Sequence, residues 1–284
     1  MKRLLLLLVV FVMCLSLASC DVLLNKAREL VTGEEVEKPP KDFVASFEDV
    51  PFNYDLYEEY IILTKYTGDE LEVVVPSEID GVKVTTIGSG CFNDLEIKIT
   101  SVKIPDSVTT IQDSAFFYAD ALVAIDIPDS VTSLGERAFS WCNSLQSVIF
   151  GKGITEIPDY CFNHCSSLKT LELPTWINKI GTRAFSYCEN LVEFTVQSNV
   201  NELGNMVFYS CPVLKYVVFE NGSTNLGENV FAECPELAVI APENSTVMEY
   251  CRENGLRFST SKDIEAVILE KNEFDSSEAT EESK

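Results

Sequence analysis

Two adjacent stretches carry the pattern that decides the fold: Ile127–Cys142, IPDSVTSLGERAFSWC, and Ser144–Phe150, SLQSVIF. Their apolar and small residues return along the chain at a nearly fixed interval. The clearest marker is a phenylalanine, which recurs after one step of 24 residues and then five steps of 23, at Phe92, Phe116, Phe139, Phe162, Phe185, Phe208 and Phe231. An interval this regular indicates a repeated structural unit.

Each repeat contains two short apolar runs and one compact segment. The first run has the form L-x-x-V-x-I, begins at Ile99 in the earliest repeat and afterwards at Leu122, Leu145, Leu168, Leu191, Leu214 and Leu237. Its alternation predicts a short strand, which Pro105, Pro128 and Pro174 end because proline cannot donate to a sheet. The second run, V-x-x-I-G, predicts another short strand. The A-F-x-x-C segment predicts one helical turn with Phe and Cys facing inward.

A period of 20 to 29 residues with such a core is typical of a leucine-rich-repeat solenoid. One repeat cannot bury its own apolar face and must stack on its neighbours. We therefore expect a mainly β solenoid of about seven 23-residue repeats, each with short parallel strands and one helical turn, between an N-terminal and a C-terminal cap.

The repeat S-L-x-x-V-x-I-P-D-S-V-T-x-I-G-x-x-A-F-x-x-C resembles the BspA-type leucine-rich repeat of bacterial surface proteins. Tyr60–Gly68 and Val73–Gly81 are similar to the N-terminal cap of such arrays, and Pro242–Gly255 is similar to their C-terminal capping helix. The resemblance implies a cell-surface protein that binds host or microbial proteins. It implies no catalytic activity.

The first twenty residues have the layout of a secretory signal peptide, with Lys2 and Arg3 before the apolar run Leu4–Val12. Leu17-Ala18-Ser19-Cys20 resembles the bacterial lipobox, in which the cysteine receives a diacylglycerol. We therefore predict lipidation at Cys20, with the protein exported and anchored to the outer side of the bacterial cytoplasmic membrane, at the cell surface. The alternative is a cleaved secretory signal with a chance cysteine.

The chain is expected to divide into six parts. These are a lipoprotein signal peptide (1–19), the lipidated cysteine with a flexible acidic tether (20–53), an N-terminal cap (54–82), leucine-rich repeats (83–241), a C-terminal capping helix (242–259) and an acidic tail expected to be disordered (260–284).

The charge of the chain argues against some partners. It carries 21 Lys and Arg against 45 Asp and Glu, a formal net charge of −24. Nucleic acid and anionic lipid surfaces would be repelled, so we expect no nucleic-acid partner. Membrane contact is expected through the lipid anchor.

A column of cysteines follows the same period, each three residues after the repeated phenylalanine, at Cys142, Cys165, Cys188, Cys211 and Cys234. One thiol per coil does not converge on a metal, so we expect buried free thiols, no metal and no cofactor. Nothing in the spacing joins a nucleophile to a base, and we expect no catalytic residues.

Two surfaces are candidates for binding. An aromatic residue stands two positions after the phenylalanine in four successive repeats, at Tyr118, Trp141, His164 and Tyr187, and Trp176 stands apart without an evident packing role. These rings are suited to protein contact or to stacking on sugars, and they are equally suited to stacking on one another.

The second surface is the outward side of the first strand, where two rows of mixed side chains are expected to face away from the core. One row includes Lys103, Asp126, Ile149 and Glu172, and the row beside it includes Glu193 and Tyr216. These residues fit a plain solvated sheet equally well. Solenoids often bind through such a face, and we expect the partner to be an extracellular host or microbial protein. The favoured function is adhesion or another protein interaction. A carbohydrate-contacting accessory protein, or a degenerate enzyme subunit, is the alternative.

Overall fold

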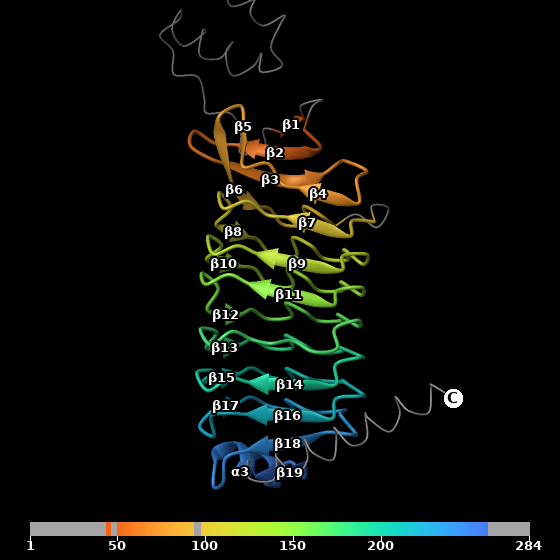
Figure 1. Cartoon of the computed structure of the whole chain (residues 1–284), viewed down its shortest axis with the longest axis vertical. Coiled ribbons are helices and arrows are strands. Elements are labelled where there is room, and N and C mark those ends of the chain that lie inside the picture. Colours follow the sequence, from red (N-terminus) through yellow and green to blue (C-terminus); the bar gives the residue numbers. More distant parts are fainter. Residues whose placement is uncertain (1–43, 47–49, 94–97, 261–284) are drawn as a thin grey trace, which may run out of the picture.

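The chain winds as a solenoid, as the prediction of a leucine-rich-repeat fold required (Figure 1). The computed structural model describes residues 44–46, 50–93 and 98–260. The predicted signal peptide, Cys20, most of the tether and nearly all of the acidic tail lie outside these residues. Within them, most coils contribute a long strand, a short strand and a turn segment, and these stack into three columns.

The long-strand column contains two parallel sheets of four strands each. Adjacent strands pair with a shift of one repeat, so that Ser147 lies opposite Ala124 and Glu193 opposite Tyr216. The first sheet contains β4 (Glu72–Val74), β7 (Ser101–Lys103), β9 (Ala124–Ile127) and β11 (Ser147–Phe150), and the second contains β14 (Glu193–Val196), β16 (Tyr216–Phe219), β18 (Ala238–Ala241) and β19 (Arg257–Thr260). Residues 170–173, between the two sheets, are not a strand.

The short-strand column also consists of two sheets. The first contains β1 (Val44–Ser46), β2 (Phe52–Leu56), β3 (Ile61–Tyr66), β6 (Val82–Ile87), β8 (Thr110–Ile111) and β10 (Ser133–Leu134), with β5 (Glu78–Ile79) paired to β6. The second contains β12 (Glu156–Ile157), β13 (Lys179–Ile180), β15 (Glu202–Leu203) and β17 (Asn225–Leu226).

Pro158 explains why the short-strand column is interrupted between β10 and β12. In other coils the residue at this position donates its backbone N–H to the preceding coil; Gly135, for example, bonds the carbonyl of Ile111 at 2.8 Å, and Gly181 bonds that of Ile157 at 2.7 Å. Proline has no N–H and cannot make this bond. One residue therefore divides a sheet that the repeat would otherwise continue.

The turn column is built differently from the strands. The helical turn expected there takes the form of linked turns with hydrogen bonds between residues three apart, such as Phe117 N–H to the Ser114 carbonyl at 3.0 Å. The residues two before and two after each phenylalanine have left-handed backbone, as Arg137 (φ 55°) and Trp141 (φ 64°) show. Phe139 donates its N–H to the Cys161 carbonyl of the next coil at 3.0 Å, so each segment is tied to the one that follows.

The phenylalanines form the centre of the core. The rings at the repeated position are buried and stack nearly parallel, with centroids 5.0 Å apart between Phe116 and Phe139 and 5.5 Å apart between Phe139 and Phe162. Each ring buries both faces against its neighbours, which is why one repeat depends on the next. Strand side chains alternate between buried and exposed, as in β9 and β11.

At Gly135, at the end of the short strand β10, the preceding coil approaches too closely for a side chain. A Cβ atom added to Gly135 would lie 2.3 Å from the backbone nitrogen of Asp113 in the coil before it. The Asp113 carboxylate in turn accepts a hydrogen bond from the N–H of Glu136 at 2.9 Å. Gly135 is thus needed for the close packing of these two coils.

Helix α3 (Thr246–Glu253) packs at the C-terminal end of the solenoid, against β17. Ser245 is its N-cap and accepts a hydrogen bond from the Met248 N–H, as is usual for serine in this position. Cys251 is buried on the inner side of the helix. The Tyr250 hydroxyl accepts the N–H of Val230 at 3.0 Å, so the helix satisfies a backbone donor of the last repeat.

Candidate protein-binding surface

The aromatic residues that follow the repeated phenylalanine form one stacked ladder. Ring centroids are 5.1 Å apart between Tyr118 and Trp141, 3.8 Å between Trp141 and His164, and 4.4 Å between His164 and Tyr187. The ring planes are within 18° of parallel. We call these four residues the aromatic ladder. The structure brings them together along the outer side of the turn column.

The left-handed backbone sets this arrangement. Each ladder residue has φ between 60° and 64°, and its N–H bonds a carbonyl of the next coil, as in Trp141 to Asn163 at 2.8 Å and His164 to Ser186 at 2.9 Å. Positive φ is uncommon outside glycine, and here the bond to the next coil holds it. Since neighbouring coils lie about 5 Å apart, successive planar side chains meet face to face.

The ladder offers few free ring faces. Trp141 and His164 have a ring on both sides, and the end residues meet further rings edge-on, with Phe117 against Tyr118 at 4.6 Å and Tyr209 against Tyr187 at 5.5 Å. A sugar that stacks on an aromatic residue needs an open face. The rings of the ladder instead stack on one another, one of the two interpretations that the sequence left open.

His164 is held in a neutral form by its position. Burial between Trp141 and Tyr187 lowers the pKa of its imidazole from the ordinary value of 6.5, and the nearby carboxylate of Glu189 opposes this in part. Burial disfavours the charged form of a histidine. The ring therefore acts as a flat, uncharged spacer in the ladder at neutral pH.

Trp176 has a packing role that its sequence position did not reveal. Its indole N–H donates to the carbonyl of Gly151 at 3.2 Å, and the half-buried ring packs against the core. The acceptor lies in the preceding coil, where positions 151 and 153 are both glycine. The expectation that Trp176 has no packing role is therefore wrong, while its place among the candidate binding residues stays a prediction.

The predicted strand-face residues lie where the sequence placed them, in the long-strand column. Glu172 is exposed and lies in segment 170–173, while Glu193 and Tyr216 are half-buried and lie opposite each other on β14 and β16. Glu172 is thus separated from the other two by the interruption between the two sheets.

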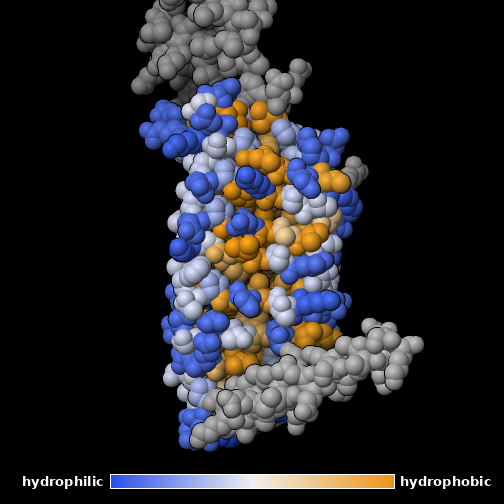
Figure 2. All heavy atoms as spheres, in the orientation of Figure 1, coloured by the Kyte–Doolittle hydropathy of each residue, from blue (hydrophilic) through white to orange (hydrophobic). Residues whose placement is uncertain are grey.

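The first sheet of the long-strand column carries most of the exposed large apolar side chains. Figure 2 shows apolar patches along the molecule on the side that carries this column. Of six exposed large apolar residues among the described ones, four lie on or directly before a strand of this sheet: Leu71 (55% exposed), Val74 (68%), Val123 (39%) and Ile149 (63%). We call these four the apolar sheet face: Val74 and Ile149 lie in one register on its outward side, and Leu71 and Val123 lie just before their strands, in register with Thr100.

Of these four residues, only Ile149 stood among the outward strand positions expected from the sequence. Val123 directly precedes β9, and Leu71 and Val74 belong to the region expected as a cap, so the repeat pattern did not mark them. The available signal was register: Val74 pairs with Lys103, which pairs with Asp126, which pairs with Ile149. Side chains in register on adjacent strands share one face.

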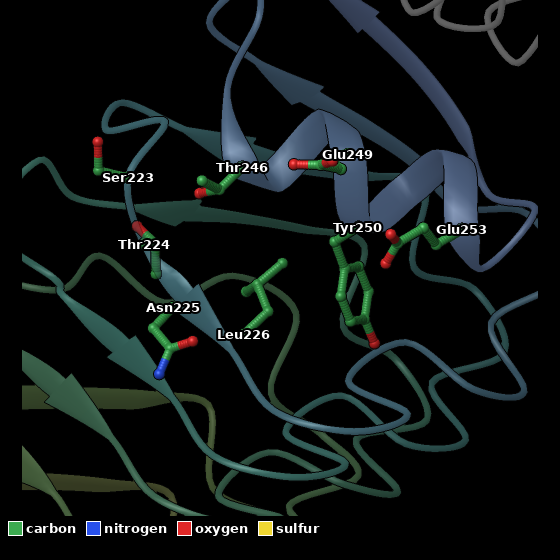
Figure 3. A pocket seen from close by; sticks show the side chains of 8 residues that line it. All are labelled: Ser223, Thr224, Asn225, Leu226, Thr246, Glu249, Tyr250 and Glu253. Atoms are coloured by element: carbon green, nitrogen blue, oxygen red, sulfur yellow. The ribbon is translucent and has the colours of Figure 1, made fainter.

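A polar hollow lies at the C-terminal end, between α3 and the β17 turn (Figure 3). Its volume is about 480 Å³, and it is lined by Ser223, Thr224, Asn225, Leu226, Thr246, Glu249, Tyr250 and Glu253. In the described ranges, no cluster of three or more His, Cys, Asp or Glu side chains is arranged to hold a metal ion. The hollow was not foreseen from the sequence.

The predicted free thiols are present as a buried column. All eight cysteines among the described residues are unpaired and buried. Each column thiol donates to the carbonyl of the phenylalanine one coil earlier, as in Cys142 to Phe116 and Cys165 to Phe139, both at 3.2 Å. Burial raises the pKa of the Cys188 thiol to about 12 and that of Cys165 well above its usual value. A neutral thiol is a poor nucleophile, so the column is structural.

Comparison with known proteins places these features in a family. The sequence profile described as the BspA type leucine rich repeat region, in six copies, matches residues 115–238 and 155–272. No curated protein matches the chain. Among the described residues, no helix combines the length and the apolar character needed to cross a membrane.

Several solved structures are similar to this chain. A leucine-rich repeat protein from Eubacterium ventriosum ATCC 27560 has 23% identity and a TM-score of 0.55, over 64% of this chain and 50% of that one. A leucine-rich repeat protein of T. pallidum has 25% identity and a TM-score of 0.48, over 79% of this chain and 98% of that one. A leucine-rich cell surface protein from Faecalibacterium prausnitzii A2-165 has 23% identity and a TM-score of 0.40, over 69% of this chain and 76% of that one.

Proposed function

The chain belongs to the BspA-type leucine-rich repeat family, and from that premise we propose that it works at the bacterial cell surface as an adhesion or interaction protein that binds an extracellular host or microbial protein through the apolar sheet face. The observation that carries the proposal is the gathering of Leu71, Val74, Val123 and Ile149 on one sheet.

The exposure of these four apolar side chains favours the binding of a partner protein. An isolated apolar residue at a surface is ordinary, whereas several exposed ones on a single sheet favour a contact site. The side chain of Ile149 is 63% exposed, whereas its neighbours Val148 and Phe150 are only 8% and 6% exposed. A flat parallel sheet held by stacked coils also presents these side chains on a rigid surface, which lowers the entropy lost on binding.

The proposal includes membrane anchoring through Cys20. Its support is the sequence Leu17-Ala18-Ser19-Cys20 after a positively charged start and an apolar run. Two or more acyl chains hold a protein stably at a membrane, whereas one chain holds it marginally. Intact-mass measurement on protein from its native membrane tests this: a species that begins at Cys20 with added acyl mass is expected, and a Cys20→Ala variant should lose that mass. An unlipidated wild-type species would contradict the anchor.

The proposed role is binding without catalysis. The histidine of the described region is enclosed in the aromatic ladder, and burial raises the pKa of the Cys165 and Cys188 thiols, which keeps them protonated. Nucleophilic catalysis needs an activated group that a substrate can reach. Neither group meets that requirement.

Binding through the apolar sheet face is tested with an array of purified extracellular host and microbial proteins. The double variant Val123→Asp, Ile149→Asp should lose at least about tenfold in affinity for any protein that binds the wild type, because it places charge in the contact. Ser133→Asp, exposed on β10 in the short-strand column, is the matched control and should bind as the wild type does. Equal binding by all three proteins would contradict the proposal.

A further inference from the structure

Strand β4 ends the long-strand column on the N-terminal side. It pairs with β7 in parallel, Glu72 opposite Ser101 and Val74 opposite Lys103, and no other strand among the described residues pairs with it. The short-strand column differs, because β2 and β1 continue it past β3. At the opposite end of the molecule, α3 packs against β17. Among the strands that the structure describes, none covers this edge of β4.

The backbone of β4 presents hydrogen-bonding groups at this edge. Leu71 and Val75 bond toward β7: the Leu71 carbonyl accepts the Thr100 N–H at 2.7 Å, and the Val75 N–H donates to the Lys103 carbonyl at 3.0 Å. In a strand, the backbone N–H and C=O groups of consecutive residues point to opposite sides, and those of every second residue point to the same side. The N–H and C=O groups of Glu72 and Val74 therefore point away from β7, where another strand could meet them.

The side chains at this edge define the partner. Val74 is 68% exposed and Leu71 55% exposed, so an added strand would cover aliphatic surface. Glu72 is exposed and has no ion pair within the described ranges. Asp69 and Glu70 precede it, so the approach to the edge is acidic. A second copy of this chain, with a net charge of −24, would be repelled.

We propose that an extended segment of the partner protein adds to β4 as a further parallel or antiparallel strand, with a basic residue beside Glu72 and an aliphatic residue beside Val74. This rests on the proposed function and specifies how the partner binds. Backbone bonds supply the contact, and side chains at alternate positions select the sequence. The short length of β4 limits the number of bonds, so the charge at Glu72 contributes much of the selectivity.

The probe is a fluorescein-labelled, end-capped peptide of eight alternating Lys and Val residues, titrated with the full chain by fluorescence anisotropy. A second peptide has the same sequence with N-methyl groups on its four central residues, which removes donors without changing charge. We expect the unmodified peptide to bind and the methylated peptide to bind at least about tenfold more weakly. Absence of binding by the unmodified peptide, or equal binding by the two peptides, would overturn the proposal.

Three variants locate the contact. Val74→Pro removes the backbone N–H that points away from β7. An edge strand tolerates proline at such a position, because the lost N–H makes no bond within the sheet. Glu72→Lys reverses the charge at the edge, and Asp126→Lys makes the same change on β9, away from the edge. We expect about tenfold weaker peptide binding for the first two variants and no change for the third. A loss with Asp126→Lys equal to that with Glu72→Lys would show general charge attraction and overturn strand addition.

The two proposals fail in different ways. If the peptide does not bind while array partners still depend on Val123 and Ile149, strand addition is wrong and binding through the apolar sheet face stands. If array partners are indifferent to Val123 and Ile149, the proposed function is wrong whatever the peptide does.

Discussion

The turn column and the first sheet of the long-strand column both carry large side chains outward at the period of the repeat, and they use them in opposite ways. Trp141 and His164 lie 3.8 Å apart, and each has a second ring on its other side. Val74 and Ile149, on β4 and β11 with two strands between them, remain more than 60% exposed. An outward position in a solenoid is therefore a binding surface only where the coil spacing does not let neighbours cover one another.

The reason lies in side-chain shape and backbone conformation. A planar ring on a left-handed residue meets the ring of the next coil at about the spacing of the coils, which is close to a stacking distance. The apolar sheet face lacks this continuity, because Lys103 and Asp126 lie between Val74 and Ile149 in the register. Charged neighbours leave the aliphatic side chains apart and open to solvent.

The largest expected difference between the two regions concerns thiol chemistry. Burial raises the pKa of Cys188 from 9.0 to about 12, which reduces its thiolate fraction at neutral pH roughly a thousandfold. We expect the eight buried thiols of the folded protein to stay unmodified by an aromatic disulfide reagent. An Ile149→Cys variant should gain one fast-reacting thiol per molecule. Rapid modification of the native column, at the rate of the new thiol, would show that the turn column opens readily.

Trp141→Ala should be the most destabilising change on the outside of the molecule. It removes the stacking of Trp141 on both Tyr118 and His164, and we expect a loss of about 2–3 kcal/mol in the free energy of unfolding. Urea denaturation followed by circular dichroism measures it. A cost below about 0.5 kcal/mol, the usual range for an exposed site, would mean that the ladder contributes no more than a free surface does.

In contrast to Trp141→Ala, Ile149→Asp should weaken binding and leave the stability of the fold nearly unchanged. We expect the free energy of unfolding to change by less than about 0.5 kcal/mol, because the side chain is 63% exposed. The affinity for an array partner should fall about tenfold, equivalent to about 1.4 kcal/mol. Urea denaturation and a binding titration on the same preparation separate the two effects. A variant that unfolds easily and binds normally would place Ile149 with the ladder as a structural residue.

The smallest expected effect is a dependence of stability on pH through His164. Because the folded state lowers the pKa of this imidazole, the unfolded chain binds the proton more readily. The stabilising contribution of the neutral ring is present above pH 6.5, the ordinary pKa, and is lost as the pH falls below it. Thermal unfolding from pH 8 to pH 5 should show the wild type losing stability relative to His164→Phe, which keeps a flat ring and does not titrate. Parallel curves for the two proteins would contradict this.

The sequence predicted the fold from its period. Because every coil must bury the same face against the next, the recurrence of Phe139, Cys142 and Leu145 at intervals of 23 was enough to predict parallel strands and a column of buried thiols. The interruption of the short-strand column was not predicted, although its cause is a single residue, Pro158, that lacks a backbone donor.

The candidate surfaces were harder to predict. Mutual stacking of the aromatic ladder depends on left-handed φ values at residues such as Trp141, which residue type does not reveal. Trp176 looked free because its packing against the core and its hydrogen bond to the Gly151 carbonyl depend on how neighbouring coils stack. The exposure of Val74 depends on where the sheet ends, and the repeat pattern carries no information about that end.

The most direct test of the central claim is site-specific crosslinking to a partner found on the protein array. A benzophenone amino acid is placed at position 149 in one variant and at position 187, the last residue of the aromatic ladder, in another. We predict adducts with the partner from position 149 and none from position 187, since the partner rests on the apolar sheet face. Adducts from position 187 alone would contradict the account and move the binding site to the turn column.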